Sequence, residues 1–397
     1  MEASAFDRDY QRKLFFPRLD FNASTGYFDG VPFTPFSVVR GITEEGETAN
    51  SASGGYLFAT PTLTVPIVRD GVPFGYNAPT VNMATQQIMI DEESLAGAKN
   101  ELILAVTTSF FSLLKNAQDI QAAEEHMRSL ELDHKIATSK FAEELISKND
   151  LLMAEVNLAS GQKDLLLFKT LSLTLSADLA TQMGLKPSPA ITVSEEAWSA
   201  PPLPPLDQLI ATAVSNRPEI KAQKARVSQA QEERRQAANQ RYPNVNVNAS
   251  YGIGYDYDSR DNSLWTTVLE FNMPIFDFGL VSARLKNLDA RVTEADKNLL
   301  TTTGAITQEV ITAFTGISNT TAEISLQEKI CEQSLENARL VRGRFDQNLS
   351  SLSAVLEAEY AVYANQKALV QARYDLTASY LQLQEAIGTP RRETPAK

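Results

Sequence analysis

The histidine and aspartate residues are the first candidates for chemistry in this chain. Its two histidines, His126 and His134, lie eight residues apart on a polar stretch expected to be helical, and no Cys, Asp or Glu at ligand spacing completes a metal site. Asp256, Asp258 and Asp261 resemble part of a calcium loop, but its glycine and closing glutamate are missing. The sequence therefore predicts no bound metal.

Motifs of enzymes are not found either. The sequence contains no phosphate-binding glycine loop, no dinucleotide-binding fingerprint and no nucleophile paired with a base. Its one cysteine, Cys331, excludes an internal disulfide framework and a four-thiolate metal site. We therefore expect a protein that has no catalytic site and needs no cofactor.

The charge argues against nucleic acid as a partner. The net charge is −13 and the isoelectric point is near 4.8, and Lys and Arg are scattered among acidic residues without forming a basic face. Such a surface repels a phosphate backbone. We expect a solvated acidic surface and no nucleic-acid binding.

Neither a transmembrane helix nor a signal peptide is predicted. The chain has no run of about 18 apolar residues, the length that a membrane helix needs. Met1 is followed by Glu2 and a charged run over residues 7–13, without the apolar core of a signal peptide.

The elements that carry these residues occur twice in the chain. Residues 141–184 align with residues 345–388 at a constant offset of 204 and share eleven identities in 44 positions. Unrelated segments would share about three. The repeat includes expected strands, because Asn-Ala-Ser at 22–24 recurs at 248–250. The half-chain is therefore a unit of one hairpin plus long helices, used twice.

The expected strands have one apolar and one polar face. In the second copy the apolar face carries Val245, Val247, Tyr251 and Ile253, and the polar face carries Asn244, Asn246 and Asn248. Two interpretations stay open. The apolar face packs on a soluble core and the polar face meets bulk water, or the apolar face meets lipid and the polar face lines water inside a barrel. Because four strands cannot close a barrel, the second interpretation requires several chains.

Long helices account for most of the remaining sequence. Residues 81–140 and 281–344 are rich in Ala, Leu, Glu, Gln and Lys and contain no proline, which permits helices of about 60 residues. The returning helix of the first half has two adjacent apolar stripes with a seven-residue period, one starting at Leu145 and one containing Leu151. This pattern predicts coiled-coil-like packing with neighbours on both sides; an ordinary antiparallel bundle explains one stripe only.

These elements predict the following domain organisation. The first repeat spans 1–185, with strands at about 15–28 and 55–67, helices at about 80–184, and most of its leading helix missing. A proline-rich connector follows at 186–206. The second repeat spans 207–390, with a helical segment at about 207–241 that restarts at Pro218, strands at about 243–256 and 263–275, and helices at about 281–388; a tail follows at 391–397. The mixed charges of the helical segment, from Arg217 to Arg235, predict a solvated face.

Together these features resemble the TolC-like outer-membrane efflux protein family. The resemblance begins at residues 216–220 (Asn-Arg-Pro-Glu-Ile), which open a helix that leads into a strand at Pro243. It continues in the strand-to-helix turn at 273–279, in Val-Leu-Glu-Ala at 355–358 and in the closing Ala-Ile-Gly at 386–388. It covers almost the whole chain, and the order and spacing of the motifs carry it.

The resemblance implies a mainly α fold with β strands. It implies a homotrimer in which each protomer contributes four antiparallel strands to one twelve-stranded barrel in the bacterial outer membrane, continued by a barrel of long helical hairpins through the periplasm. The family forms the exit duct of tripartite efflux or type I secretion systems, with a periplasmic adaptor protein and an inner-membrane pump as partners. In such a duct Val245, Val247, Tyr251 and Ile253 would face lipid, and the three asparagines would face the lumen.

The resemblance also places the entrance of the duct at the helix tips. Family members narrow this aperture with acidic rings, for which Asp150 and Glu357 are the candidates here. A helix-start carboxylate beside the N-terminal dipole is the plainer explanation for either residue. The tips that would contact the adaptor carry Leu145, Ser147, Asn348 and Leu349.

The sequence departs from the family pattern at three places in the tips and at its start. Glu144 and Asn348 stand where a glycine is usual, and Ala354 stands where a further acidic residue is common. The second repeat places a helical segment before its first strand, whereas the first repeat offers only residues 2–14. We expect an internal start or a fragment.

A coiled-coil scaffold is the alternative function. In that case the hairpins would merely cap a helix bundle, and their apolar faces would be buried against the protein's own helices. The two functions therefore differ in what covers the side chain of Val247 and its neighbours.

Overall fold

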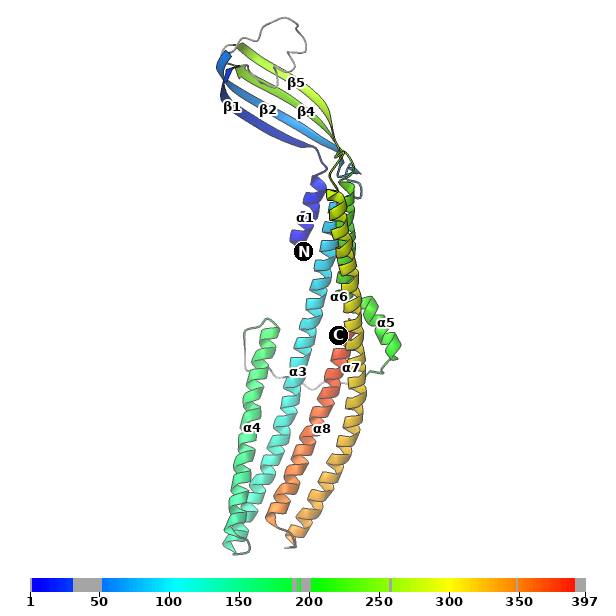
Figure 1. Cartoon of the computed structure of the whole chain (residues 1–397). Helices are drawn as coiled ribbons and strands as arrows, with labels where there is room; N and C mark the ends of the chain where they lie inside the picture. Colours follow the sequence, from blue (N-terminus) through cyan, green and yellow to red (C-terminus); the bar gives the residue numbers. More distant parts are fainter. Residues whose placement is uncertain are drawn as a thin grey trace, which may run out of the picture. The chain divides into compact units, whose positions relative to one another are not determined.

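The computed structural model describes residues 2–30, 52–187, 191, 193, 201–256, 259–347 and 349–389. It confirms a mainly helical chain with one antiparallel sheet (Figure 1). The described elements are α1 (Glu2–Lys13), β1 (Arg18–Gly30), β2 (Ala52–Arg69), β3 (Val72–Pro73), α3 (Pro79–Ala142), α4 (Lys148–Gln182), α5 (Leu206–Asn216), α6 (Pro218–Asn239), β4 (Asn244–Asp256), β5 (Ser259–Asn272), α7 (Leu280–Asp346) and α8 (Leu352–Ala386).

The chain divides into two compact units, which are described separately. Residues 1–92 and 222–300 form the sheet unit. Residues 93–221 and 301–397 form the helix unit. The long helices α3 and α7 each begin in the sheet unit and end in the helix unit.

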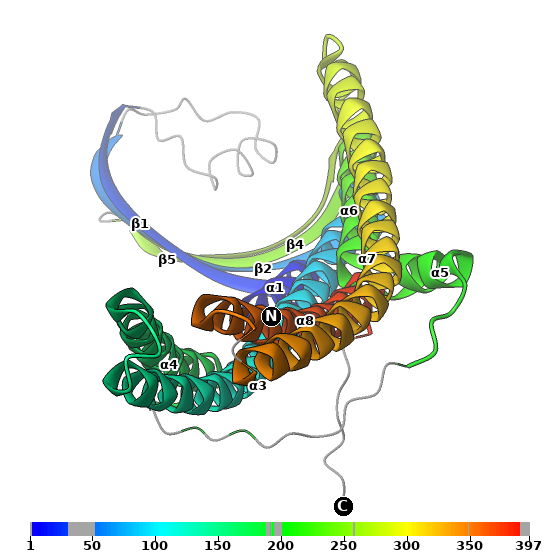
Figure 2. The ribbon, with the colours of Figure 1, turned by 90° about the horizontal axis from the view of Figure 1, so that it is seen from below.

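The sheet unit contains an antiparallel sheet with the strand order β1-β2-β4-β5, to which the short β3 adds by pairing with β2. Seen from below, the four long strands form a curved band (Figure 2). In the described part of the chain, β1 and β5 pair with a neighbour on one side only. The sheet therefore ends in two strands that can accept a further partner.

The second hairpin ends earlier than predicted. The expected strand at 263–275 is β5, which ends at Asn272. Pro274 has no N–H to donate to a ladder, so the strand cannot continue through it. Asp277 then starts α7, because its carboxylate accepts hydrogen bonds from the backbone N–H groups of Gly279 and Val281 at 2.9 Å each.

One glycine holds the turn after β2. Gly71 has a φ of +71°, and a Cβ placed there would lie 2.9 Å from the Cβ of Tyr242. Any other residue would meet both the backbone strain of the left-handed region and this contact. The turn thus requires glycine at this position.

The helix unit contains two antiparallel helix pairs and the short α5. The long helices α3 and α7 contain 64 and 67 residues, and α4 and α8 contain 35 residues each. Two serines begin the returning helices in the same way, since Ser147 caps α4 and Ser351 caps α8 through their hydroxyl oxygens. Within the described residues, no helix is long and apolar enough to cross a membrane.

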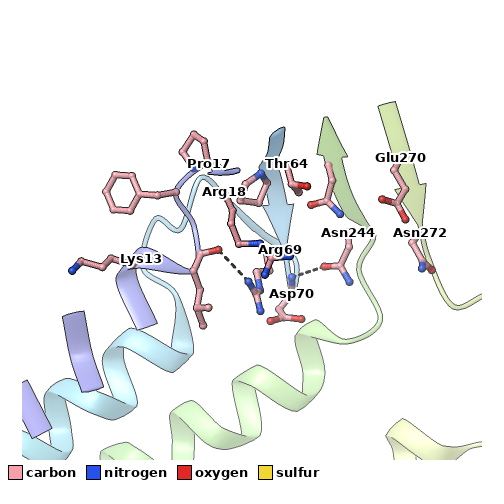
Figure 3. A pocket seen from close by; sticks show the side chains of 13 residues that line it. Lys13, Pro17, Arg18, Thr64, Arg69, Asp70, Asn244, Glu270 and Asn272 are labelled. Carbon is pink, nitrogen blue, oxygen red and sulfur yellow. Dashed lines mark hydrogen bonds between the residues drawn. The ribbon is translucent and has the colours of Figure 1, made fainter. Parts of the chain in front are cut away.

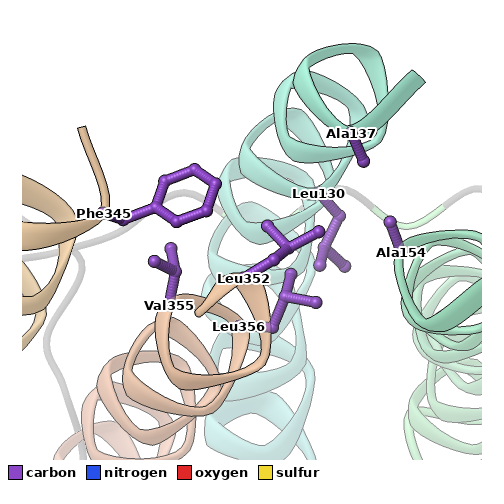
Figure 4. Close-up of a cluster of buried hydrophobic side chains, with 7 residues drawn as sticks. All are labelled: Leu130, Ala137, Ala154, Phe345, Leu352, Val355 and Leu356. Atoms are coloured by element: carbon purple, nitrogen blue, oxygen red, sulfur yellow. The ribbon is translucent and has the colours of Figure 1, made fainter. Parts of the chain in front are cut away.

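The core of the helix unit near its tips joins all four helices. It consists of seven buried residues: Leu130, Ala137, Ala154, Phe345, Leu352, Val355 and Leu356 (Figure 4). Side chains of the second predicted stripe on α4, Leu151 and Leu158, pack against this cluster. One of the two stripes therefore packs against the chain's own core.

The expected break at Pro218 is confirmed. Helix α5 ends at Asn216 and α6 begins at Pro218, because proline lacks the donor for a continuous helix and disfavours a helical conformation of the residue before it. Arg217 lies between the two helices with a φ of −58° and a ψ of 124°.

Candidate functional site

The two faces of the sheet are as different as the sequence predicts. Residues that lie directly opposite in neighbouring strands share a face. Val247 lies between Val65 and Leu269, and Tyr251 lies opposite Trp265. These pairs build a continuous apolar face, which also includes Val245.

The large side chains of the apolar face are exposed. Leu19 and Phe21 of β1 have exposed fractions of 71% and 70%, and Leu269 and Phe271 of β5 have 66% and 63%. Tyr251 is 42% exposed, and Val245 and Val247 are partly buried. The side chain of Ile253 lies outside the described part of the structure. An apolar surface of this extent is unusual for a protein face that meets water.

The opposite face is held together by polar contacts. The side-chain amide of Asn248 donates to Glu270 at 3.0 Å, and the hydroxyl groups of Ser250 and Thr266 are 2.5 Å apart. Asn246 pairs with Glu270 across the strands, although Val268, opposite Asn248, is apolar. The three predicted asparagines thus lie on one polar face.

A polar hollow of about 520 Å³ opens on this face near the ends of the strands (Figure 3). Asn244 and Asn246 line it together with Arg18 of β1 and Glu270 of β5. Its floor is fixed by two hydrogen bonds: Arg69 donates to the carbonyl of Leu14 at 3.1 Å, and the N–H of Asp70 donates to Asn244 at 2.6 Å. Charged and amide groups therefore face solvent here.

The tip between α3 and α4 places Asp150 in a helix cap. The N–H of Ser147 donates to the Asp150 carboxylate at 3.1 Å, and the N–H of Asp150 donates to the Ser147 hydroxyl at 3.2 Å. This reciprocal pair is a capping box. The plainer explanation for Asp150 therefore applies, and Leu145 beside it is 63% exposed.

A strained residue closes the same tip. Glu144 has a φ of +58°, in the left-handed region that favours glycine. The N–H of Leu145 donates to the carbonyl of Lys140 at 2.9 Å, which ends α3 in the manner of a glycine-terminated helix. The backbone at Glu144 thus adopts the conformation that a glycine would favour.

The tip between α7 and α8 leaves the other predicted residues exposed. Leu349 is 72% exposed, and Glu357, in the second turn of α8, is also exposed. Asn348 lies outside the described residues. Asp150 and Glu357 remain predictions as aperture residues, as do the four tip residues as an adaptor surface.

Arg217 does not lie on a solvated face, so the prediction of a solvated face from Arg217 to Arg235 is wrong for this residue. Four other basic residues of this segment are exposed: Lys221, Lys224, Arg226 and Arg234. The Arg217 side chain is 7% exposed and donates to the Glu385 carboxylate at 2.9 Å, to the Glu385 carbonyl at 2.8 Å and to Glu309 at 2.9 Å. Its Nε lies 3.0 Å from a carboxylate oxygen of Glu219. Arg217 thus ties the start of α6 to α7 and to the end of α8.

A second charged cluster, near the tips, was also not predicted from the sequence. Arg342 of α7 binds Asp133 of α3 at 2.5 Å and Glu359 of α8 at 3.0 Å. The Asp133 side chain is 1% exposed. The cluster joins three helices within the helix unit.

The two histidines do not form a metal site. The ring of His126 stacks on that of Tyr363, with centroids 4.4 Å apart. Burial lowers the pKa of His126, so the ring is mostly neutral at neutral pH. Across the described ranges, no group of three or more His, Cys, Asp or Glu is placed to hold a metal ion.

Comparisons with known proteins agree with this architecture. Residues 209–389 match the family model of the outer membrane efflux protein. TolC of Escherichia coli strain K12 is 24% identical over 181 residues, which cover 42% of this chain and 37% of TolC. The pyoverdine export outer membrane protein OpmQ of Pseudomonas aeruginosa is 24% identical over 318 residues, which cover 77% of this chain and 65% of OpmQ.

A solved structure shows the same fold over nearly the whole chain. The outer-membrane channel OprN superposes with a TM-score of 0.82 at 16% identity, covering 98% of this chain and 85% of that channel. By contrast, the matched sequence spans well under half of the length of TolC. By the matched family domain, the related sequences and the shared fold, the chain is similar to TolC-like outer membrane efflux proteins, with the family domain itself matched over residues 209–389.

Proposed function

We propose that this protein is the outer-membrane exit duct of a tripartite efflux or type I secretion system. Three copies contribute their four-stranded sheets to one closed barrel in the outer membrane, and their helices continue the duct into the periplasm. The protein acts as a passive conduit. A periplasmic adaptor and an inner-membrane pump supply the substrate and the energy.

The observation that carries the proposal is the exposed apolar face of a curved sheet whose other face is polar. Lipid is a favourable environment for Leu19, Phe21, Leu269 and Phe271, each at least 63% exposed. The polar face with its asparagines and its hollow would be solvated by water in the lumen. The scaffold alternative would bury these apolar side chains, and their exposure argues against it.

The need for several copies is supported by the exposed stripe on α4. Of the two predicted stripes, the one containing Leu145, Leu152, Leu166 and Leu173 is exposed, with fractions of 63%, 46%, 65% and 53%. A seven-residue apolar period favours a helix partner. A second copy of this chain would cover the stripe in the trimer.

The helix tips provide the proposed aperture and docking surface. Three copies of Asp150 and Glu357 would form acidic rings that attract cations, because like charges around a narrow pore create a negative potential. Exposed Leu145 and Leu349, with the Ser147 cap beside them, would offer the adaptor an apolar contact rimmed by polar groups.

The proposal is tested by a lysine placed on either face of β4. Val247→Lys puts a charge on the apolar face, at a cost of about 2–4 kcal/mol in the middle of a bilayer. Asn246→Lys puts the same charge one residue earlier, on the polar face. After refolding in detergent and addition to planar bilayers, wild type and Asn246→Lys should conduct, and Val247→Lys should insert poorly.

Two results would refute the proposal. One is wild-type protein that folds but never conducts. The other is equal insertion of the two lysine variants, because β4 would then have no lipid-facing side.

A further inference from the structure

An acid pair, Asp133 buried and Glu359 partly buried, lies between α3 and α8 close to the tips and has no role in the proposed duct. Glu359 of α8 accepts a hydrogen bond from the Ser129 hydroxyl at 2.7 Å, and its other oxygen binds Arg342 of α7 at 3.0 Å. Asp133 of α3 binds the same guanidinium at 2.5 Å. One arginine therefore serves two carboxyl groups from two helices.

The charges of this cluster do not balance when both acids are ionised. Asp133 is 1% exposed and Glu359 is 16% exposed, while Arg342 supplies a single positive charge. An unpaired negative charge at a buried position is costly, because water cannot solvate it. A proton on one of the two carboxyl groups removes the excess charge.

The geometry also provides an acceptor for that proton. One carboxylate oxygen of Asp133, Oδ2, is buried and accepts no hydrogen bond from any described residue. Asp133 and Glu359 both bind the Arg342 guanidinium, at 2.5 and 3.0 Å, which brings the two carboxyl groups together. A protonated Glu359 could thus donate to the oxygen that otherwise stays unsatisfied.

We infer that Glu359 is a proton-controlled tie between α3 and α8: it holds the two helices together when protonated and weakens their contact when ionised. The inference concerns the helix unit alone. If the proposed function is correct, the tie lies beside the aperture and makes the tips easier to separate as the pH rises.

The groups around Glu359 support a transition near neutral pH. Burial is the largest influence and the hydrogen bond with Asp133 adds to it, so the pKa of Glu359 rises to about 7, although Ser129 and Arg342 act in the opposite direction. For Arg342, burial acts to lower the pKa, but the hydrogen bond to Asp133 and the charges of Asp133, Glu359 and Asp346 raise it overall. The guanidinium therefore stays charged throughout.

Two aromatic rings lie near this cluster, those of His126 on α3 and Tyr363 on α8, and they stack on each other. His126 of α3 has a pKa that burial lowers, against the charges of Asp164 on α4 and of Asp133. Tyr363 of α8 has a pKa that burial raises to about 12, with smaller contributions from Asp164, Asp119 and Tyr360. Both rings are thus mostly neutral from pH 7 to 8.

The direction of the pH effect follows from the raised pKa. The protonated Glu359 stabilises the contact between α3 and α8 fully below pH 4.5, the ordinary pKa of a glutamate. This stabilisation is lost as the pH rises through about 7, the raised pKa. Between pH 6 and pH 8, these two values predict about a tenfold increase in the open-to-closed ratio of the contact.

Hydrogen exchange of the folded protein tests this inference. The protection factors of peptides covering 129–137 of α3 and 352–363 of α8 should fall about tenfold between pH 6 and 8, after correction for intrinsic exchange. Glu359→Gln, which mimics the neutral acid, should abolish this pH dependence. Glu131→Gln, which changes an exposed carboxylate of α3 two residues from Asp133, should retain it.

The inference is overturned if the protection of wild type does not change with pH, or if Glu359→Gln shows the same loss as wild type. Should Glu359→Gln fail to fold, infrared difference spectra of wild type between pH 6 and 8 give a second test. A carboxylic acid band that disappears across this range is expected, and its absence refutes the tie. Neither readout requires a conducting channel, so failure of the tie and failure of the proposed duct remain distinguishable.

Discussion

Replacing Arg217 by alanine should strongly destabilise the helix unit. Its guanidinium makes three hydrogen bonds of 2.8–2.9 Å, two to Glu385 and one to Glu309, with a side chain that is only 7% exposed. A hydrogen bond to a charged group contributes about 1.5–3 kcal/mol. Because Glu309 and Glu385 are 50% and 30% exposed, water can replace part of each bond. We therefore expect a loss of about 3 kcal/mol rather than the full sum.

The assay is urea unfolding of the full chain in detergent, combined with hydrogen exchange of residues 206–239 to locate the change. Arg217→Lys should recover part of the loss, because an ammonium group can bind one carboxylate but cannot bridge three elements. Arg339→Ala is the matched control: it removes an arginine whose ion pair with Glu336 lies on the same chain but is 76% exposed. Exposed pairs contribute little. An Arg217→Ala variant no less stable than Arg339→Ala would refute the reasoning.

The remaining predictions concern the helix tips and the packing of α4. At Gly161 a Cβ would lie 2.7 Å from Leu130 and 3.2 Å from Met127, so Gly161→Leu should lower the unfolding free energy by about 2 kcal/mol. Gly304 has open space around it, so the control Gly304→Leu should not lower the unfolding free energy. Equal thermal midpoints of the two variants would contradict this packing. Glu144→Gly should raise the unfolding free energy by about 0.5 kcal/mol, and with it the thermal midpoint, because it removes the backbone strain of a φ of +58°. A lower midpoint would show that the Glu144 side chain makes a compensating contact. Asp150→Asn combined with Glu357→Gln should reduce the preference of single channels for cations. An asparagine at position 150 keeps a side-chain oxygen that can accept the hydrogen bond from the N–H of Ser147, so the helix cap is retained. Unchanged selectivity would show that neither residue lines the aperture.

The local elements could be predicted from the sequence because each has a periodic or steric cause within a few residues. Alternation over 244–253 reflects the two faces of one strand. Helices of the length of α3 and α7 follow from long stretches without proline, and Pro218 marks the break between α5 and α6. The end of β5 at Asn272 was missed because the alternation continues past the point where Pro274 cannot pair.

The charged clusters could not be predicted in the same way, because their partners are far apart in the sequence. Arg217 contacts residues 92 and 168 positions away, and Asp133 contacts a residue 209 positions away. Among Lys, Gln and Glu, a buried arginine has the same local pattern as a solvated one. Its position directly before Pro218, inside the motif that carries the family resemblance, was the available signal.

The acid candidates at the tips show a further limit of the sequence. Asp150 caps α4 through Ser147, so the residue has a structural role that accounts for an acid at this position. Glu357 has no such cap and is exposed. A role of either in the aperture depends on the neighbouring copies, which the sequence of one chain does not place.

The most direct test of the account is the number of chains in the folded, detergent-purified particle, measured by native mass spectrometry. We predict a particle of three chains in which Leu19 and Phe271 are shielded by detergent, as expected for a shared barrel wall. A folded single chain that keeps its apolar sheet face away from detergent would contradict the account.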